Sequence, residues 1–479
     1  MQLDPLMAVS SIDGRYRTYG DMLAVSFSEF ALIKNRVRVE CEYLIALSET
    51  SGTGLRKLTA EEKKTLHEIV SGFSLEDARI VKSIEEDGYE EIPATNHDVK
   101  AVEYFLKLKL KGTSLEDVSE WIHFALTSED VNNIAYALML RSALEETLLP
   151  ALDFLQKEID SLAKAHAGTQ MLARTHGQPA SPTTFGKEMR VLGARIERQR
   201  EQLKERPILV KFGGATGNWN AHAAALPDVD WPEFSKKFVE HFNIPSGSVH
   251  PRGTLGIGKS GIKLELNGIT TQIEPHDSYA ELFDNLRRIN TILIGFSQDI
   301  WRYVSDGWIT QKPKSGEVGS SAMPHKVNPI DFENAEGNLG VANALFEHFS
   351  RKLPISRLQR DLSDSTVERT FGLALGHSYI GYRTITKGLG KILVNERAML
   401  EALQAHPEVI AEAIQTVLRK EGVEVPYEKL KELTRGKEVS HEDFAKFIDA
   451  LDVSDKVKKR LKSFRPENYL GLAEKIAKQ

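Results

Sequence analysis

The chain has 479 residues, and its 41% hydrophobic and 27% charged content is that of an ordinary soluble globular protein. This length exceeds what one core usually supports and indicates two to four domains. The net charge of −6 argues against a general nucleic-acid-binding surface, and the single cysteine, Cys41, excludes an intramolecular disulfide framework and a cysteine-cluster metal site.

The sequence carries no recognisable targeting signal. The N-terminal "MQLDPLMAVSS" lacks the basic and apolar regions of a signal peptide, and the C-terminal "EKIAKQ" is neither a peroxisomal nor a retention signal. Runs of 18 apolar residues, which a membrane span would need, are absent from the sequence. We therefore expect a cytoplasmic protein that does not cross a membrane.

Apolar residues recur mainly at helical spacing. Such stripes run through residues 130–140, 150–168 and 278–304, and the last segment is long enough for the central helix of a bundle. Strand-like alternation is scarce, and we expect strands only within residues 206–212 and 261–268. These patterns predict a mostly α protein built around a central bundle of long helices.

Changes in composition along the chain predict three domains. "GTSLEDV", which begins at Gly112, resembles the start of a new capped helix, and a glycine-rich stretch follows residue 370. We expect an N-terminal helical domain at 1–115, a central helical-bundle domain at 116–370 and a C-terminal helical domain at 371–479. The glycine-rich residues 244–261 are expected to form a long exposed loop.

Two predicted helix starts carry side chains that suit an anionic ligand. Asn96, His97 and Asp98 precede one helix, whose free amides could hold an anion with His97 and Asn96 as further donors. Simple capping of that helix by Asn96 or Asp98 is an equal alternative. At the second start, Thr127 and Ser128 supply hydroxyl groups that suit a carboxylate, although the same residues also fit a capping box.

Three further segments concentrate polar side chains. His176 lies in a Gly/Pro-rich break between helical stretches, where it could act as an acid or base or simply make a structural hydrogen bond. "TTQIEPHD" places Gln272 before the longest helix, and amide recognition and capping explain it equally well. Arg357, Arg360 and Arg369 suit phosphate and carboxylate groups, unless they lie on a solvated helix face.

Residues 319–329, "GSSAMPHKVNP", combine reactive side chains with a backbone unsuited to regular structure. Pro324 and Pro329 prevent a helix, and the small residues allow the segment to open and close over a substrate. Lys326 supplies a positive charge for a carboxylate, although a flexible solvated loop is the plainer alternative. Because motifs for nucleotide cofactors, serine hydrolases and zinc are absent, we expect cofactor-free acid–base chemistry on an anionic substrate.

"GSSAMPHKVNP" resembles the signature of the fumarase/aspartase lyase superfamily, whose members release fumarate by β-elimination. "TNHDVKAVEYF", "RTHGQPASPTTFGKEM", "TTQIEPHD" and "QRDLSDSTVER" are similar to adenylosuccinate lyases of the bacterial type, and the similarity covers nearly the whole chain. The resemblance implies cleavage of adenylosuccinate to AMP and fumarate, and of SAICAR to AICAR and fumarate, in purine synthesis without a cofactor or metal. It also implies a homotetramer that shares its active sites between subunits, with the long helices forming the common core.

The resemblance further implies a role for each motif. Ser320 would act as the general base, and Lys326 and Asn328 would stabilise the charge that develops on the substrate carboxylate. His176 would protonate the departing nitrogen, and His97 would lie near the substrate phosphate and could share that task. Substrate binding is assigned to Arg15, Tyr16, Asn96, Asp98, Thr127, Ser128, Gln272, Asn328, Arg360, Ser365 and Arg369.

The sequence departs from the bacterial pattern at residues 245–265 and 85–94, which are longer and are expected at the surface. Two other interpretations compete with an adenylosuccinate lyase. Another lyase of the superfamily, such as argininosuccinate lyase or fumarase, is disfavoured by "TNHD" and "RDLSDS". A scaffolding homologue without activity is disfavoured because Ser320, Lys326 and both histidines are present together.

Overall fold

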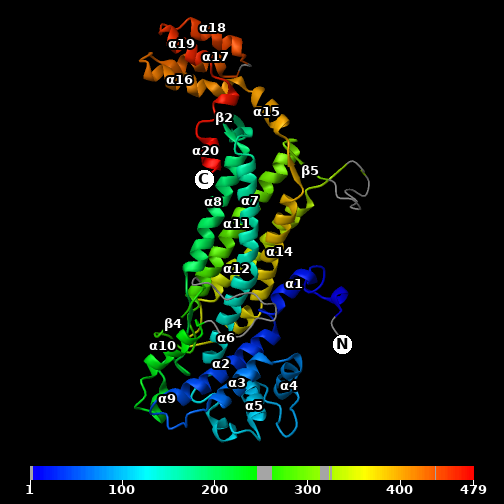
Figure 1. Cartoon of the computed structure of the whole chain (residues 1–479), viewed down its shortest axis with the longest axis vertical. Helices are drawn as coiled ribbons and strands as arrows, with labels where there is room; N and C mark the ends of the chain where they lie inside the picture. Colours follow the sequence, from blue (N-terminus) through cyan, green and yellow to red (C-terminus); the bar gives the residue numbers. More distant parts are fainter. Residues whose placement is uncertain (1–3, 245–260, 313–322, 324–325, 437–438) are drawn as a thin grey trace. The chain divides into compact units, whose positions relative to one another are not determined.

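The computed structural model of the chain describes residues 4–244, 261–312, 323, 326–436 and 439–479. The described part is mainly helical (Figure 1), which confirms the predicted mostly α fold. None of its helices is both long enough and apolar enough to cross a membrane. Most of the predicted loop at 244–261 lies outside the described residues.

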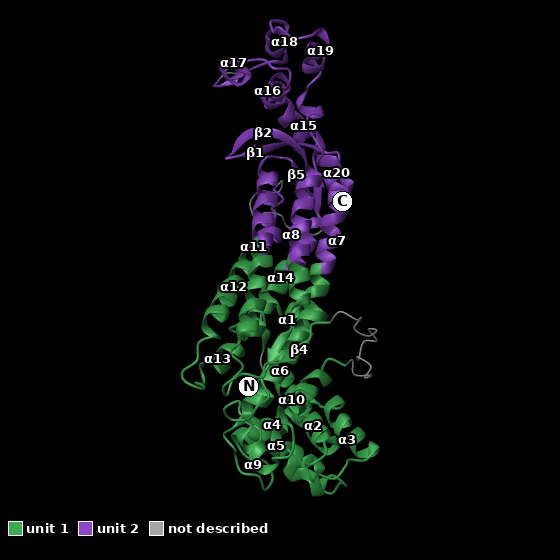
Figure 2. Ribbon diagram, turned by 90° about the vertical axis from the view of Figure 1, so that its left-hand side faces the viewer, with its two compact units in different colours: residues 1–152, 199–291, 337–381 green, residues 153–198, 292–336, 382–479 purple. Residues whose placement is uncertain are grey.

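The chain divides into two compact units, each made of three separate segments (Figure 2). Unit 1 comprises residues 1–152, 199–291 and 337–381, and unit 2 comprises residues 153–198, 292–336 and 382–479. The predicted division into three consecutive domains stays a prediction.

Five helices contribute residues to both units, because each unit boundary falls inside a helix. They are α7 (Leu149–Ala165), α8 (Phe185–Glu205), α11 (Asp277–Ser305), α12 (Ile330–Lys352) and α14 (Phe371–Leu389). The 29 residues of α11 confirm the long helix predicted at 278–304. Its apolar stripe is buried as the helical spacing requires, at Leu282, Leu286, Ile289, Leu293 and Phe296.

Unit 1 has a hydrophobic core around α2 (Glu29–Glu49), which also packs against α6 (Ser128–Ala143). Cys41 belongs to this core, where burial raises the pKa of its thiol. The other helices of the unit are α1 (Arg17–Ala24), α3 (Ala60–Ser71), α4 (Leu75–Glu86), α5 (Asp98–Leu110), α9 (Asn220–Ala225), α10 (Trp231–His241) and α13 (Ser363–Glu368).

The predicted strands of unit 1 are confirmed, whereas one predicted helix is wrong. β3 (Ile208–Val210) and β4 (Leu264–Leu266) lie within the two predicted segments and pair in parallel. The capped helix expected to begin near Gly112 is only a 3₁₀ helix, Glu116–Trp121, whose start has no capping side-chain hydrogen bond. Its backbone amides donate to the carbonyl three residues earlier, as Val118 does to Leu115 at 3.2 Å, which is the 3₁₀ pattern.

Unit 2 contains strands that the sequence did not predict. β1 (Gln170–Thr175) and β2 (Gln178–Thr184) form an antiparallel hairpin, and β5 (Ile309–Gln311) pairs with β6 (Ile392–Val394). The two-residue turn between β1 and β2 is His176 and Gly177, both with positive φ, which suits the twist of a hairpin. The other helices of the unit are α15 (Glu396–Gln404), α16 (Ala411–Lys420), α17 (Pro426–Thr434), α18 (His441–Asp449), α19 (Asp455–Lys462) and α20 (Ala473–Ala477).

Candidate active site

The first turns of α5 and α6 lie side by side in unit 1. His97 is the N-cap of α5, and its Nδ1 accepts a hydrogen bond from the Lys100 amide at 3.2 Å. Its Nε2 lies 3.4 Å from the Ser128 hydroxyl at the start of α6. The imidazole thus takes the N-cap position, whereas the Asp98 carboxylate, one of the two expected caps, accepts a hydrogen bond from the Val99 amide at 2.8 Å. Asn96 adopts a left-handed φ of 50°. Two predicted site residues, His97 and Ser128, are thus in contact.

Asp98 joins two arginines. Its Oδ2 lies 2.7 Å from Arg36 and 3.1 Å from Arg369, and Arg369 also pairs with Glu29 at 2.9 Å. Burial would raise the pKa of Asp98, but the positive charges of Arg36 and Arg369 hold it below its ordinary value. The predicted residues Asp98 and Arg369 therefore belong to one charged group.

Arg36 was not predicted as a site residue, although its position among the apolar residues of α2 could have indicated it. It is only 2% exposed and lies on the same face of α2 as the core residues Ile33 and Val37. A charged residue on an apolar stripe indicates a buried partner, since an unpaired buried charge is costly. The partners, Asp98 and the side chain of Asn132, come from elsewhere in unit 1.

The start of α6 is anchored by a buried carboxylate. Asp130 is fully buried and accepts hydrogen bonds from the amides of Thr127, Gly213 and Gly214 at 2.8 to 3.1 Å. Its Oδ1 also lies 2.6 Å from the ammonium of Lys211, which is equally buried. The capping interaction expected at Thr127 is therefore present, and it ties the helix start to the glycine-rich loop after β3.

Arg360 connects α6 to the segment that precedes α11. It pairs with Glu129 at 3.0 Å and donates a hydrogen bond to Oε1 of Gln272 at 3.3 Å. The nitrogen of the Gln272 amide donates in turn to the carbonyl of Ala215 at 3.0 Å. The Arg360 side chain is 14% exposed, so the alternative of a solvated helix face is wrong for this residue. Arg357, by contrast, is 82% exposed.

Arg360 is part of a buried cluster of charged side chains. The cluster consists of Glu129, His276, Asp364 and Glu368, each at most 4% exposed, together with Arg360 itself. Burial and the negative charge of Glu368 raise the pKa of Glu129 above its ordinary range. Burial alone would lower the pKa of His276, but Glu368, 3.4 Å away, and Glu129 raise it to about 9.

This cluster contains the one set of possible metal ligands in the part of the chain that the structure describes. Atoms of Glu129, His276 and Asp364 lie within 4.8 Å of one another. A metal would require a neutral imidazole, whereas the surrounding carboxylates favour the charged form of His276. Arg360 already places a positive charge beside Glu129. The positive charges of His276 and Arg360 therefore suit the carboxylates of this cluster better than a bound metal ion does.

The remaining predicted residues of unit 1 lie at two helix starts. Ser365 belongs to α13, where its amide donates to the Asp364 carboxylate at 2.7 Å, next to the charge cluster. Arg15 is exposed immediately before α1, and Tyr16 is the residue that precedes the first turn of that helix. The binding roles of Arg15 and Tyr16 stay predictions.

Three predicted residues of unit 2 lie in the part of the chain that the structure describes. His176 is exposed at the tip of the β1–β2 hairpin, with a φ of 54°. Lys326 is exposed and Asn328 half-buried in the segment that leads into α12, where the Lys326 amide donates to the Met323 carbonyl at 3.0 Å. Ser320 lies outside the described residues.

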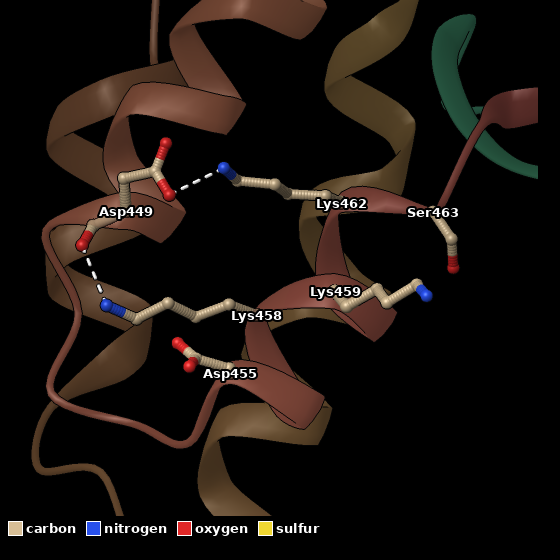
Figure 3. A pocket seen from close by; sticks show the side chains of 6 residues that line it. All are labelled: Asp449, Asp455, Lys458, Lys459, Lys462 and Ser463. Atoms are coloured by element: carbon tan, nitrogen blue, oxygen red, sulfur yellow. Dashed lines mark hydrogen bonds and ion pairs between the residues drawn. The ribbon is translucent and has the colours of Figure 1, made fainter.

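A hollow of about 470 Å³ opens elsewhere in unit 2 (Figure 3). It is lined by Asp449, Asp455, Lys458, Lys459, Lys462 and Ser463. Lys458 and Lys462 both contact Asp449, through its carbonyl at 2.9 Å and its carboxylate at 2.5 Å. None of the predicted site residues lines this hollow, and two of its three lysines already contact Asp449, so we assign the candidate site to the cluster in unit 1 instead.

Two family models and several curated proteins match nearly the whole chain. The model of the lyase family matches residues 14–343, and that of the adenylosuccinate lyase C-terminal region matches residues 356–470. The adenylosuccinate lyase of Escherichia coli strain K12 is 49% identical over 99% of this chain and 98% of its own length. The chain belongs to the adenylosuccinate lyase family. As a member of this family it is a lyase.

Adenylosuccinate lyases from other organisms are also similar to this chain. The adenylosuccinate lyase of Haemophilus influenzae is 47% identical over the full length of both chains, and that of Dictyostelium discoideum is 48% identical over 98% of both. The crystal structure of a fumarate lyase from Mesorhizobium sp. BNC1 has a TM-score of 0.69 at 19% identity, covering 95% of this chain and 96% of that chain. At that identity the likeness concerns the fold alone.

Proposed function

We propose that this lyase splits adenylosuccinate into AMP and fumarate, and SAICAR into AICAR and fumarate, in purine nucleotide biosynthesis. The observation that carries the proposal is the identity of 47–49%, over almost the entire chain, to proteins named adenylosuccinate lyase from three organisms. Both substrates carry a phosphate and two carboxylates. The arginines and helix starts gathered in unit 1 support a site for such anions.

The chemistry begins at a C–H bond next to a carboxylate, which is a very weak acid. We assign its removal to Ser320, whose hydroxyl becomes a usable base when backbone N–H groups and positive charge surround its oxygen. Lys326 and Asn328 then stabilise the charge that moves into the substrate carboxylate. His176 protonates the departing nitrogen, and His97 orients the phosphate end of the substrate.

Binding is assigned to the residues of unit 1. Thr127, Ser128 and Gln272 hold the carboxylates of the succinyl group, and the charged group around Asp98 holds the nucleotide and phosphate together with Arg15, Tyr16, Asn96, Arg360, Ser365 and Arg369. All steps are proton transfers and an elimination, so the reaction needs no cofactor. We also propose a cytoplasmic homotetramer that shares its active sites between subunits.

The reaction is tested by incubating the purified protein separately with adenylosuccinate, SAICAR and argininosuccinate, and by testing whether it hydrates fumarate. We expect fumarate from the first two substrates. Fumarate from argininosuccinate alone, or hydration of fumarate, would refute the proposal. A folded protein that acts on none of them would favour the scaffolding interpretation. Light scattering should give four times the chain mass of 53.6 kDa if the protein is a tetramer.

A further inference from the structure

The side-chain amide of Gln272 is held in one orientation by a hydrogen-bond donor on one side and an acceptor on the other. Arg360 has only donors and gives its hydrogen bond to Oε1, whereas the Ala215 carbonyl is an acceptor and takes its hydrogen bond from Nε2. Turning the amide over would place its oxygen against the carbonyl and its nitrogen against the guanidinium. The observed orientation leaves the second N–H of the Gln272 amide as a donor for a ligand.

Arg360 is itself held by Glu129. The Glu129 side chain is 1% exposed, and its Oε2 lies 3.0 Å from the Arg360 guanidinium. Glu129 follows directly after Thr127 and Ser128 in the chain, in the first turn of α6. One buried ion pair therefore links the helix start that carries these hydroxyls to the amide of Gln272.

We propose that Glu129 is a positioning residue that acts through Arg360 and keeps an N–H of Gln272 directed to a substrate carboxylate. This inference rests on the proposed function, in which Gln272 contacts the succinyl group. Without Glu129 the guanidinium loses the nearer of its two buried carboxylate partners, since Asp364 lies 3.9 Å away, and the guanidinium can leave the Gln272 oxygen so that the amide turns over. It then presents an oxygen, which repels a carboxylate. The loss of one hydrogen bond to a charged group weakens binding by about 10- to 100-fold.

The test is Glu129→Gln, with Glu62→Gln as the matched control. Glu62 is also a buried glutamate paired with an arginine, Arg56, at 2.8 Å, and glutamine preserves its capping role at the start of α3. We expect Glu129→Gln to raise the KM for adenylosuccinate about 10- to 100-fold and to change kcat less than about threefold. This is the result when the lost interaction stabilises the bound substrate and the transition state equally. Glu62→Gln should change neither constant. An unchanged KM in Glu129→Gln, or an equal rise in both variants, would overturn the proposal.

A second variant keeps the test decisive if Glu129→Gln does not fold. Gln272→Glu preserves an acceptor for Arg360 but replaces the amide N–H with a carboxylate oxygen. We expect its KM to rise at least about tenfold and its unfolding temperature to fall slightly, because a carboxylate oxygen then faces the Ala215 carbonyl. A wild-type KM would overturn the assigned amide orientation. If the wild type itself released no fumarate from adenylosuccinate, the proposed function would fail instead.

Discussion

The charge of His276 should make the stability of the fold depend on pH. Burial alone would lower the pKa of His276, but Glu368 at 3.4 Å, with the charges of Glu129 and Glu274, raises it to about 9. A histidine in the unfolded chain titrates near about 6.5. The folded state thus binds the proton more tightly. The stabilisation by His276 is fully present below about pH 6.5 and is lost as the pH rises through about 9.

The size of the effect follows from the difference between the two pKa values. A rise from 6.5 to about 9 corresponds to about 3 kcal/mol, at about 1.4 kcal/mol per pKa unit. Gln in place of His276 cannot titrate. The difference in unfolding free energy between the wild type and His276→Gln should therefore shrink by about 3 kcal/mol between about pH 6 and about pH 9.5. Arg360, Asp364 and Glu274 also face the cluster and are present in both proteins.

Urea unfolding at a fixed protein concentration, followed by circular dichroism, measures this difference. His222→Gln is the matched control, because His222 is fully buried and burial lowers its pKa to about 4. It stays neutral in the folded protein over this range, and only the unfolded chain binds a proton there below about pH 7. The difference between the wild type and His222→Gln should therefore change by only about 1 kcal/mol, and in the opposite direction. If His276→Gln also showed the wild-type pH dependence, the reasoning that His276 is charged would be refuted.

Four substitutions test the other assignments. Ser320→Ala should lower turnover by orders of magnitude with substrate binding largely intact, and comparable activity would exclude Ser320 as the base. His176→Ala should abolish turnover, and small nitrogen bases should restore part of it if the imidazole transfers a proton. Lys326→Met should lower kcat more than it raises KM, so a change in KM alone would contradict its role. Asp130→Asn leaves the buried Lys211 without its counter-ion, 2.6 Å away, and should cost about 3–5 kcal/mol of unfolding free energy. An unchanged urea midpoint would contradict that estimate.

The helices were predicted from local patterns in the sequence. The stripe of α11 recurs every three or four residues because one face of a helix must be buried, and no knowledge of the partner is needed to see it. The Thr127–Asp130 interaction is equally local, since a helix start satisfies its own amides within one turn. The β1–β2 hairpin was missed because Pro179 and Pro182 interrupt its second strand and its turn is His-Gly, not Asn-Gly.

The sequence by itself determined the helical class, the long helix α11 and the motifs of the family, and it singled out Arg360 but not Glu129 or Glu368 of the charge cluster in unit 1. Only the tertiary structure decided which charges pair: Asp98 with Arg36 and Arg369, and Glu129 with Arg360. It also placed His276 against Glu368. The physical reason is that periodicity shows which side of a helix is buried. It does not show which distant side chain packs against that side. The charge of a buried group depends on this neighbouring side chain.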